Sequence, residues 1–352
     1  MTALGDLLIA RIARTGPISL VDYMADCLMH PVHGYYATRD PFGQSGDFIT
    51  APEISQMFGE LIGLSLAQAW IDQGSPAAIT LAELGPGRGT LMADVLRATK
   101  AVPGFHDALT VHFVETSLVL RQAQAQAVHH AIWHDSAATL PDQPLFLIAN
   151  EFFDALPIRQ FVRAGDAWRE KMIGLTDQVL SFGLSSAAPI SLLEHRLADT
   201  SEGDLVEHCP ALPAIMQAIG NMIEVHGGAA LIIDYGDWQS QGDTLQALKA
   251  HEHVDPLSTA GANDLTAHVD FAAIAHNAAP AKFTRLTTQG VFLERLGITA
   301  RAQTLTQSLT GSARQAHILA HRRLTHPAEM GDLFKVMGIY PATATPPAGL
   351  EP

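Results

Sequence analysis

The strongest constraint on the fold of this chain is an alternation of short apolar segments with helical segments that begins at residue 77. Strands are expected at 77–85, 109–115, 131–135 and 145–149, with helices over 90–100 and 117–130. Strands that alternate with helices favour a parallel, doubly wound sheet that is buried on both faces. The sequence therefore predicts an α/β fold with a Rossmann-like core.

The rest of the chain is expected to surround this core. The segment 168–184 suggests two further strands, and 227–236 is another buried strand that ends on an acid. Thr50 and Glu53 have capping-box spacing and predict a helix that continues to about Trp70. The expected divisions are a helical N-terminal lid region at 1–76, the core at 77–184, a helical insertion or substrate arm at 185–226, the C-terminal part of the same domain at 227–340 and a flexible tail at 341–352.

The composition excludes several classes of protein. The 352 residues carry 36 acidic against 21 basic side chains, a net charge of −15, so a nucleic-acid binder with a basic face is not expected. Apolar runs stay below the roughly 18 residues that span a bilayer, so no membrane insertion is expected. Two cysteines, Cys27 and Cys209, provide no disulfide framework and favour a reducing compartment.

A glycine-rich loop lies between the first strand and helix of the expected core. It contains Glu83, Gly85, Pro86, Gly87 and Gly89, followed by Thr90. A nicotinamide or flavin fingerprint would place its third glycine at residue 90, and no Gly-Lys-Ser/Thr of a phosphate-binding loop follows. Glycines at such a turn allow a ligand to approach the backbone closely, although an ordinary turn remains the alternative.

Acidic residues at the ends of successive strands indicate which cofactor this loop suits. Glu83 would repel a pyrophosphate but suits the ammonium and sulfonium of S-adenosylmethionine. Glu115 ends the second strand, where a bidentate acceptor can bind a ribose diol. Asp135, followed by Ser136, ends the third strand and is placed to meet an adenine amino group. Each could be an exposed strand-end residue, but together they predict an S-adenosylmethionine site.

Several longer segments resemble one methyltransferase family. These segments are ELGPGRGTLMADVLR, GDFITAPEISQMFGE, NEFFDALPIRQF, LIIDYG, DLTAHVDF and HPAEMGDLFKV. They are similar to the MidA-type methyltransferases, relatives of the mitochondrial complex I assembly-factor protein-arginine methyltransferase. The resemblance runs from about Pro17 to about Met337. It implies a seven-stranded sheet with one antiparallel strand, and symmetric dimethylation of an arginine in a respiratory complex I subunit. Glu207-His-Cys209-Pro210 departs from the family, where a serine is expected before the proline.

The segment NEFFDALP would then face the substrate at the end of the fourth strand. A carboxylate that accepts two guanidinium N–H groups can orient an arginine and localise its charge. Glu151 is predicted to be this clamp and Asp154 a second acceptor or proton relay. The alternatives are a strand-end turn for Glu151 and a cap for Asp154. The other predicted contacts are Asn150 near the cofactor, Phe152 and Phe153 as cleft walls, and Asp47, Phe48 and Thr50 in a lid loop.

Other functions and partners follow as alternatives. A nicotinamide-dependent oxidoreductase, a cofactor-binding assembly chaperone without turnover, and a methyltransferase for another protein or small molecule stay open. The expected partner is a protein substrate, with a homodimer left open. The expected location is the cytoplasm for a bacterial source or the mitochondrial matrix for a eukaryotic one. His251-Glu-His253-Val-Asp255 lacks matching distant ligands, so no metal site is predicted.

Overall fold

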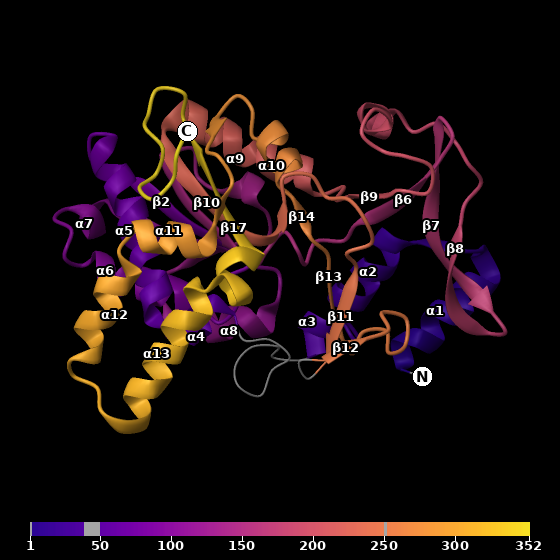
Figure 1. The fold of residues 1–352 in the computed structure, drawn as a ribbon, viewed down its shortest axis with the longest axis horizontal. Helices are drawn as coiled ribbons and strands as arrows, with labels where there is room; N and C mark the ends of the chain where they lie inside the picture. Colours follow the sequence, from indigo (N-terminus) through magenta and orange to yellow (C-terminus); the bar gives the residue numbers. More distant parts are fainter. Residues whose placement is uncertain (1, 39–49, 250–251) are drawn as a thin grey trace.

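The computed structural model describes residues 2–38, 50–249 and 252–352, and its main feature is a twisted, mostly parallel sheet (Figure 1). Seven strands form a continuous path in the order β15-β17-β10-β5-β2-β3-β4. Their bounds are β2 Ile79–Leu84, β3 Leu109–Val114, β4 Ile132–His134, β5 Leu145–Asn150, β10 Gly228–Asp237, β15 Lys282–Phe283 and β17 Phe334–Tyr340. Strand β17 runs antiparallel to β10 and β15, and β14 Val269–Asp270 and β16 Thr287–Thr288 pair beside the path. The expected α/β fold is confirmed, with nine strands in the sheet rather than seven.

Helices cover both faces of this sheet, as the apolar strands require. In β5, Phe146 and Ile148 pack toward the cluster that contains α5 and α6, whereas Leu147 and Ala149 pack toward α9 and α10. This alternation follows from the two-residue period of a strand. The helices of the two layers and the C-terminal region are α5 Gln56–Asp72, α6 Thr90–Thr99, α7 Phe105–Ala108, α8 Leu118–Ala127, α9 Leu212–His226, α10 Phe271–Asn277, α11 Gln289–Arg295, α12 Ile298–Thr306 and α13 Gly311–Thr325.

Two smaller sheets lie beside the main one, to the right in Figure 1. The first has the order β1-β7-β6-β9, with β8 paired to β7, and the second has the order β12-β11-β13. The strands are β1 Ile18–Ser19, β6 Arg159–Ala164, β7 Ala167–Thr176, β8 Val179–Leu184, β9 Leu205–His208, β11 Gln246–Lys249, β12 Glu252–Val254 and β13 Asp264–Thr266. Helices α1 Ala3–Thr15 and α2 Leu20–Met29 share a core with both small sheets.

The structure differs from the sequence-based expectation at 185–226. This segment contains a short 3₁₀ helix at Ser191–Leu197, strand β9 and helix α9, so a helical insertion is wrong. Helix α9 packs on the main sheet, where its apolar stripe joins the core, and the inserted part is the β-rich segment from β6 to β9. Strand β9 pairs with β6, for example Val206 with Phe161, so periodicity within 185–226 does not reveal the pairing.

Two other expectations are corrected near the chain ends. The helix from Thr50 is interrupted at Ser55, which separates α4 Ala51–Ile54 from α5 and caps α5 through Met57 N–H. The tail 341–352 packs on the protein: Ala348 accepts a hydrogen bond from the Ser65 hydroxyl (2.8 Å), and Glu351 pairs with Arg295 (2.8 Å). These contacts bridge more than fifty residues and leave no local pattern. The N-terminal helices also include α3 Tyr35–Thr38.

A helix that crosses a bilayer needs about 20 predominantly apolar residues. None of the helices in residues 2–38, 50–249 and 252–352 combines the length and apolar character of a membrane span.

The packing of α9 against the loop after α10 predicts the effect of one substitution. A Cβ added at Gly220 would lie 2.0 Å from the Ala278 carbonyl oxygen. Gly220→Ala is therefore expected to lower the free energy of unfolding by about 2 kcal/mol, although alanine favours an isolated helix by roughly 1 kcal/mol. Chemical denaturation of both proteins measures the difference.

The matched control is Asn221→Ala, one position along α9 and exposed. Alanine there is expected to leave stability unchanged or to raise it slightly. If Gly220→Ala were as stable as the wild type, α9 would not approach residue 278 in solution.

Candidate functional site

The glycine loop joins β2 to α6 at the carboxyl edge of the main sheet. Gly85, Gly87 and Gly89 have φ angles of +57°, +52° and +84°, which lie in the left-handed region that favours glycine. Gly85 N–H donates to the Val114 carbonyl (3.0 Å), and Gly89 N–H donates to the Pro86 carbonyl (2.7 Å). The loop is thereby held against the end of β3 and turns directly into the first turn of α6.

Glu83 is buried beneath this loop, near the end of β2. Glu83 is 3% exposed, and its Oε2 atom has no hydrogen-bond partner among the described residues. Burial raises the pKa of Glu83 to about 8, and a hydrogen bond from the Met92 backbone opposes this only in part. A buried polar atom without a partner is rare and marks a position where a donor from outside the chain can bind.

The strand end at Asn150 and Glu151 forms the opposite wall. Glu151 adopts a left-handed conformation with φ +50°, and its N–H donates to the Ile233 carbonyl (2.9 Å). Its Oε1 accepts hydrogen bonds from Asn150 Nδ2 (3.1 Å) and Ala51 N–H (3.4 Å). The Asn150 Oδ1 atom is buried without a partner, like Glu83 Oε2. A non-glycine residue in this conformation indicates that the surrounding contacts fix the turn.

A small cavity of about 50 Å³ lies between the two walls. The predicted site residues that line it are Thr50, Glu83, Gly85, Pro86, Gly87, Asn150 and Glu151. Glu53 also lines it and accepts a hydrogen bond from the Thr90 hydroxyl (2.7 Å). Thr50 is the N-cap residue of α4, as its spacing predicts, but its side chain makes no cap hydrogen bond there. Asp47 and Phe48 lie outside the described residues.

Glu115 lies next to the glycine loop at the end of β3. Its Oε1 accepts from Ser117 N–H (2.7 Å), and its Oε2 accepts from Gln124 Nε2 (3.3 Å). Gln124 Nε2 also lies 2.8 Å from the Gly87 carbonyl, so this fully buried amide joins the carboxylate to the loop. The sequence reasoning missed Gln124, since a glutamine in the middle of a helix carries no motif.

Asp135 and Ser136 make structural contacts at the end of β4. The Asp135 carboxylate is 84% exposed and pairs with Arg121 at 2.5 Å. The Ser136 hydroxyl accepts from Ala138 N–H (3.3 Å) and caps a 3₁₀ turn at Ala137–Thr139. Contacts of these two residues with a cofactor stay a prediction.

Asp154 lies deeper than Glu151, 5% exposed, and does not line the small cavity. Its Oδ2 accepts from the Tyr235 hydroxyl (2.5 Å), and Asp234 Oδ2 accepts from its backbone N–H (3.3 Å). Burial, and then the charge of Asp154, raise the pKa of Glu151 to about 8. Burial raises the pKa of Asp154 to about 6 against the Tyr235 hydrogen bond. Asp234 and Tyr235 were missed, although a buried strand ending on an acid was a signal.

The two phenylalanines of this turn have different surroundings. A Cβ at Gly85 would lie 2.9 Å from Phe152 Cδ2, so the Phe152 ring lies directly against the glycine loop. The Phe153 ring meets Phe152 edge-on at 5.2 Å and is 4% exposed in the core that contains α9. Phe152 does not line the small cavity itself, so its role as a cleft wall stays a prediction, whereas Phe153 is chiefly a core residue.

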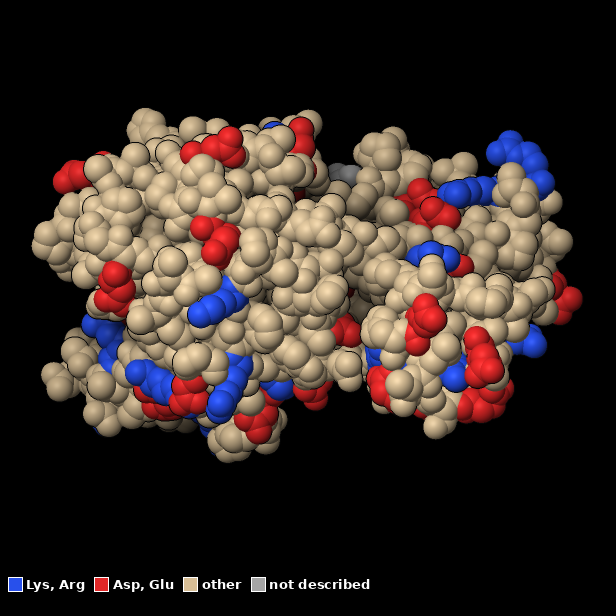
Figure 2. Space-filling model, turned by 90° about the horizontal axis from the view of Figure 1, so that it is seen from above, with Lys and Arg blue, Asp and Glu red and all other residues tan. Residues whose placement is uncertain are grey.

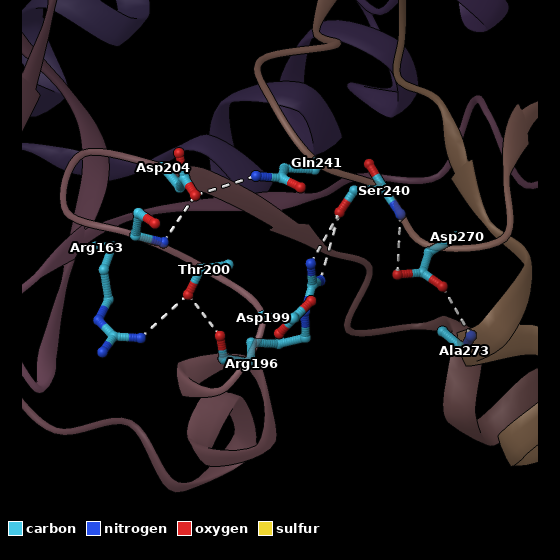
Figure 3. A network of polar contacts seen from close by, with 10 residues as sticks. Arg163, Arg196, Asp199, Thr200, Asp204, Ser240, Gln241, Asp270 and Ala273 are labelled. Atoms are coloured by element: carbon cyan, nitrogen blue, oxygen red, sulfur yellow. Dashed lines mark hydrogen bonds and ion pairs between the residues drawn. The ribbon is translucent and has the colours of Figure 1, made fainter.

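A much larger cavity, about 620 Å³, lies beyond Phe153, between the β-rich insertion and helices α9 and α10. Four histidines line it: His195, His208, His268 and His276. Figure 3 shows the polar network on its rim: Arg196 Nε lies 2.9 Å from Asp199 Oδ2 and its terminal nitrogens lie 3.4 Å from the Ser240 carbonyl. Asp270 accepts from Ser240 N–H (3.4 Å) and caps α10 through Ala273 N–H (2.9 Å).

The two cavities point to different roles. The larger cavity contains no residue of the glycine loop, so its volume alone does not make it the cofactor site. The unpartnered oxygens of Glu83 and Asn150 favour the small cavity as the place where a cofactor binds. Among the described residues, no three His, Cys, Asp or Glu side chains are grouped so that they could hold a metal ion.

Comparison with known proteins agrees with this geometry. Residues 61–289 match a family described as "Putative S-adenosyl-L-methionine-dependent methyltransferase". The chain is 36% identical over 370 residues to the protein arginine methyltransferase NDUFAF7, mitochondrial, of Xenopus laevis, covering 96% of this chain and 84% of that protein. It is 34% identical over 368 residues to the Homo sapiens protein of the same name, covering 95% and 82%.

A solved structure is similar over almost the whole chain. It is a superfamily member and "likely methyl transferase" from Burkholderia thailandensis bound to S-adenosyl-homocysteine. The TM-score is 0.82 at 28% sequence identity, and the match covers 99% of this chain and 94% of that one. The expected cofactor, S-adenosylmethionine, and the expected enzyme class are confirmed, and the chain belongs to the S-adenosyl-L-methionine-dependent methyltransferase family.

Proposed function

We propose that this methyltransferase modifies the guanidinium group of an arginine in a protein. The observation that carries the proposal is a pair of carboxyls, the half-buried Glu151 and the buried Asp154, in the turn that also contributes Asn150 to the small cavity. Carboxyls that are withdrawn from water suit a cationic acceptor, which supplies the opposite charge. The names of the NDUFAF7 relatives support arginine as that acceptor.

The residues of the small cavity fit S-adenosylmethionine. When bound, this cofactor supplies a methyl group on a sulfonium sulfur. Glu83 and Asn150, each with an unpartnered buried oxygen, would accept hydrogen bonds from its ammonium group. The backbone of the glycine loop would lie against the bound cofactor, and Glu115 would bind the ribose hydroxyls of the cofactor. Phe152 would exclude water from the reacting atoms.

The reactivity of the arginine acceptor depends on its charge and on its orientation toward the methyl group. A guanidinium is delocalised and always protonated, so it becomes a nucleophile only when held in line and relieved of a proton. Glu151 would orient it through paired N–H···O contacts. Methyl transfer forms an N–CH₃ bond, breaks the S–CH₃ bond, leaves the electron pair on sulfur and releases one guanidinium proton. Asp154 Oδ1, which has no hydrogen-bond partner, would accept that proton.

The large cavity is the proposed route for the acceptor polypeptide. It shares Phe153 with the turn that carries Asp154, and it opens beside the β-rich insertion. Seen from above, a furrow separates the part built on the main sheet from the part built on the smaller sheets (Figure 2). The cavity volume of about 620 Å³ is in the range of substrate pockets.

A more specific proposal concerns which protein is methylated and how many methyl groups its arginine receives. We propose symmetric dimethylation of an arginine in a respiratory complex I subunit, in the bacterial cytoplasm or the mitochondrial matrix according to the source. A homodimer is compatible with it. The mitochondrial names of the relatives support the compartment for a eukaryotic form.

Transfer of a labelled methyl group tests the proposal. Incubation with methyl-labelled S-adenosylmethionine and isolated complex I subunits, followed by amino-acid hydrolysis, is expected to yield methylated arginine. Glu151→Gln is expected to reduce the rate at least a hundredfold, as loss of an orienting contact does, while cofactor affinity changes less than threefold. Label on lysine, on another residue or on a small molecule alone would reject arginine as the acceptor.

A substitution in the glycine loop tests the cofactor contacts. Valine at residue 87 has to adopt φ +52°, at a cost of about 1–2 kcal/mol, and it adds bulk to a residue that lines the small cavity. Gly87→Val is therefore expected to weaken S-adenosylmethionine binding at least tenfold in calorimetric titration. The control is Gly74→Val, which also has a positive φ (+84°) but nothing within 4 Å of its Cβ. Equal binding by both variants would remove the loop from the cofactor site.

The raised pKa of Glu151 also predicts a pH dependence of stability. A carboxyl with a higher pKa in the folded than in the unfolded chain favours folding at low pH, and this contribution is lost as the pH rises. For Glu151 the window runs from about 4.5 to about 8. Glu151→Gln is therefore expected to be more stable than the wild type at pH 8, by about 1–2 kcal/mol, and to match it near pH 4.5. Denaturation at both pH values measures this, and a difference that does not change with pH would contradict it.

A further inference from the structure

Two consecutive residues of β10, Asp234 and Tyr235, hold Asp154 from two sides. Asp234 has no exposed surface, and its Oδ2 accepts from the backbone N–H groups of Phe153 (3.0 Å) and Asp154 (3.3 Å). Its Oδ1 accepts from Tyr235 N–H (2.9 Å). The Tyr235 hydroxyl donates to Asp154 Oδ2 at 2.5 Å. One strand end thus fixes both the backbone and one carboxylate oxygen of Asp154.

These contacts leave a single acceptor atom of Asp154 available. Its carbonyl oxygen accepts from Ala267 N–H (3.0 Å), its N–H donates to Asp234 and its Oδ2 accepts from Tyr235. Its Oδ1 is buried and has no hydrogen-bond partner in the part of the chain that the structure describes. Because a carboxylate is planar, holding Oδ2 also sets the direction of Oδ1.

The Tyr235 ring cannot turn its hydroxyl away easily. It is 8% exposed, and it meets His268 and Phe334 edge-on, each at a centroid distance of 5.5 Å. His268 comes from the segment after β13 and Phe334 from β17, so the ring is held between two elements besides its own strand. Such packing makes the hydroxyl a preorganised donor, because the ring is already ordered before any substrate binds.

We propose that Tyr235 is a positioning residue for methyl transfer, which holds Asp154 so that Oδ1 faces the acceptor guanidinium and can take the released proton. The inference rests on the proposed function. In the balanced reaction the methyl group passes to a guanidinium nitrogen, the bonding electron pair stays on sulfur, and one N–H proton passes to Asp154 Oδ1. Tyr235 touches neither reacting atom and acts through Asp154.

The charged and titratable surroundings of Asp154 set the sign of the pH effect. They comprise Glu151 in the same turn, Asp234 and Tyr235 on β10, Tyr36 on α3 and His268 beside the Tyr235 ring. Burial raises the pKa of Asp154, and the Tyr235 hydrogen bond is the first interaction that lowers it. Removal of the hydroxyl is therefore expected to raise this pKa further and to reduce the fraction of ionised Asp154 at neutral pH.

Tyr235→Phe keeps the ring and removes the donor. With the arginine acceptor, its kcat is expected to fall at least tenfold at pH 7, with changes below threefold in the acceptor KM and in S-adenosylmethionine affinity. The acidic limb of its kcat profile is expected to move to higher pH, so that activity recovers toward the wild type at pH 9. An equal loss at every pH would indicate a purely structural role and overturn the inference.

Tyr340→Phe is the matched control, since Tyr340 is another buried tyrosine (4% exposed) on the neighbouring strand β17. It is expected to leave both kcat and its pH profile unchanged. If it shifted the profile as Tyr235→Phe does, the effect would not be specific to the hydroxyl on Asp154. A second measurement keeps the packing of the Tyr235 ring. Replacement of the five tyrosines by 3-fluorotyrosine makes the Tyr235 hydroxyl a stronger hydrogen-bond donor. The acidic limb of the kcat profile is then expected to move to lower pH.

A measurement of the Asp154 titration without the arginine acceptor separates this inference from the proposed function. Carboxyl ¹³C-labelled aspartate, with the Asp154 signal assigned through Asp154→Asn, reports the titration of Asp154 in the S-adenosylhomocysteine complex. A higher Asp154 pKa in Tyr235→Phe is expected. An unchanged Asp154 pKa overturns the role of Tyr235 even if arginine is methylated. A wild type that methylates no arginine rejects the proposed function, and the guanidinium-facing role of Tyr235 with it.

Discussion

The carboxylate of Asp234 is the interaction on which the site depends. It accepts backbone hydrogen bonds from Phe153, Asp154 and Tyr235, and so it closes the turn that follows β5. That turn contains Glu151 at φ +50°, which an isolated segment would rarely adopt. With the turn closed, Asn150 and Glu151 face the glycine loop while Asp154 points toward Tyr235. The chemistry of the site follows from this one buried acid.

Several polar groups of the candidate site are buried in a way that is unfavourable in a folded protein. The oxygens of Glu83, Asn150 and Asp154 are buried without partners, and the pKa values of Glu83 and Glu151 are raised to about 8. Such groups persist because the packed sheet holds them in place, and each gains a partner only when a donor binds. On the proposed function, the cofactor and the acceptor would supply these missing donors.

How far sequence predicts such a site depends on the kind of residue. The glycine loop, Glu83, Glu115 and the Asn150-Glu151 turn can be predicted to lie near one another, because each ends an apolar run at the carboxyl edge of the sheet. Tyr235 and Gln124 cannot, because one lies inside a strand and the other inside a helix. Their roles come from partners 81 and 37 residues away, Asp154 and Gly87. The segment 185–226 was misread for the same reason: β9 owes its conformation to β6.

The sequence alone determined the parallel sheet, the glycine loop and its cofactor, since hydrophobic period and strand-end residues are local properties of the chain. Only the tertiary structure decided which buried groups meet. It brought Asp234 and Tyr235 to Asp154, folded residues 159–208 with the N-terminal strand into a separate sheet and packed the tail on α5. These contacts join residues far apart in sequence, and no periodicity in the sequence records which residues pair.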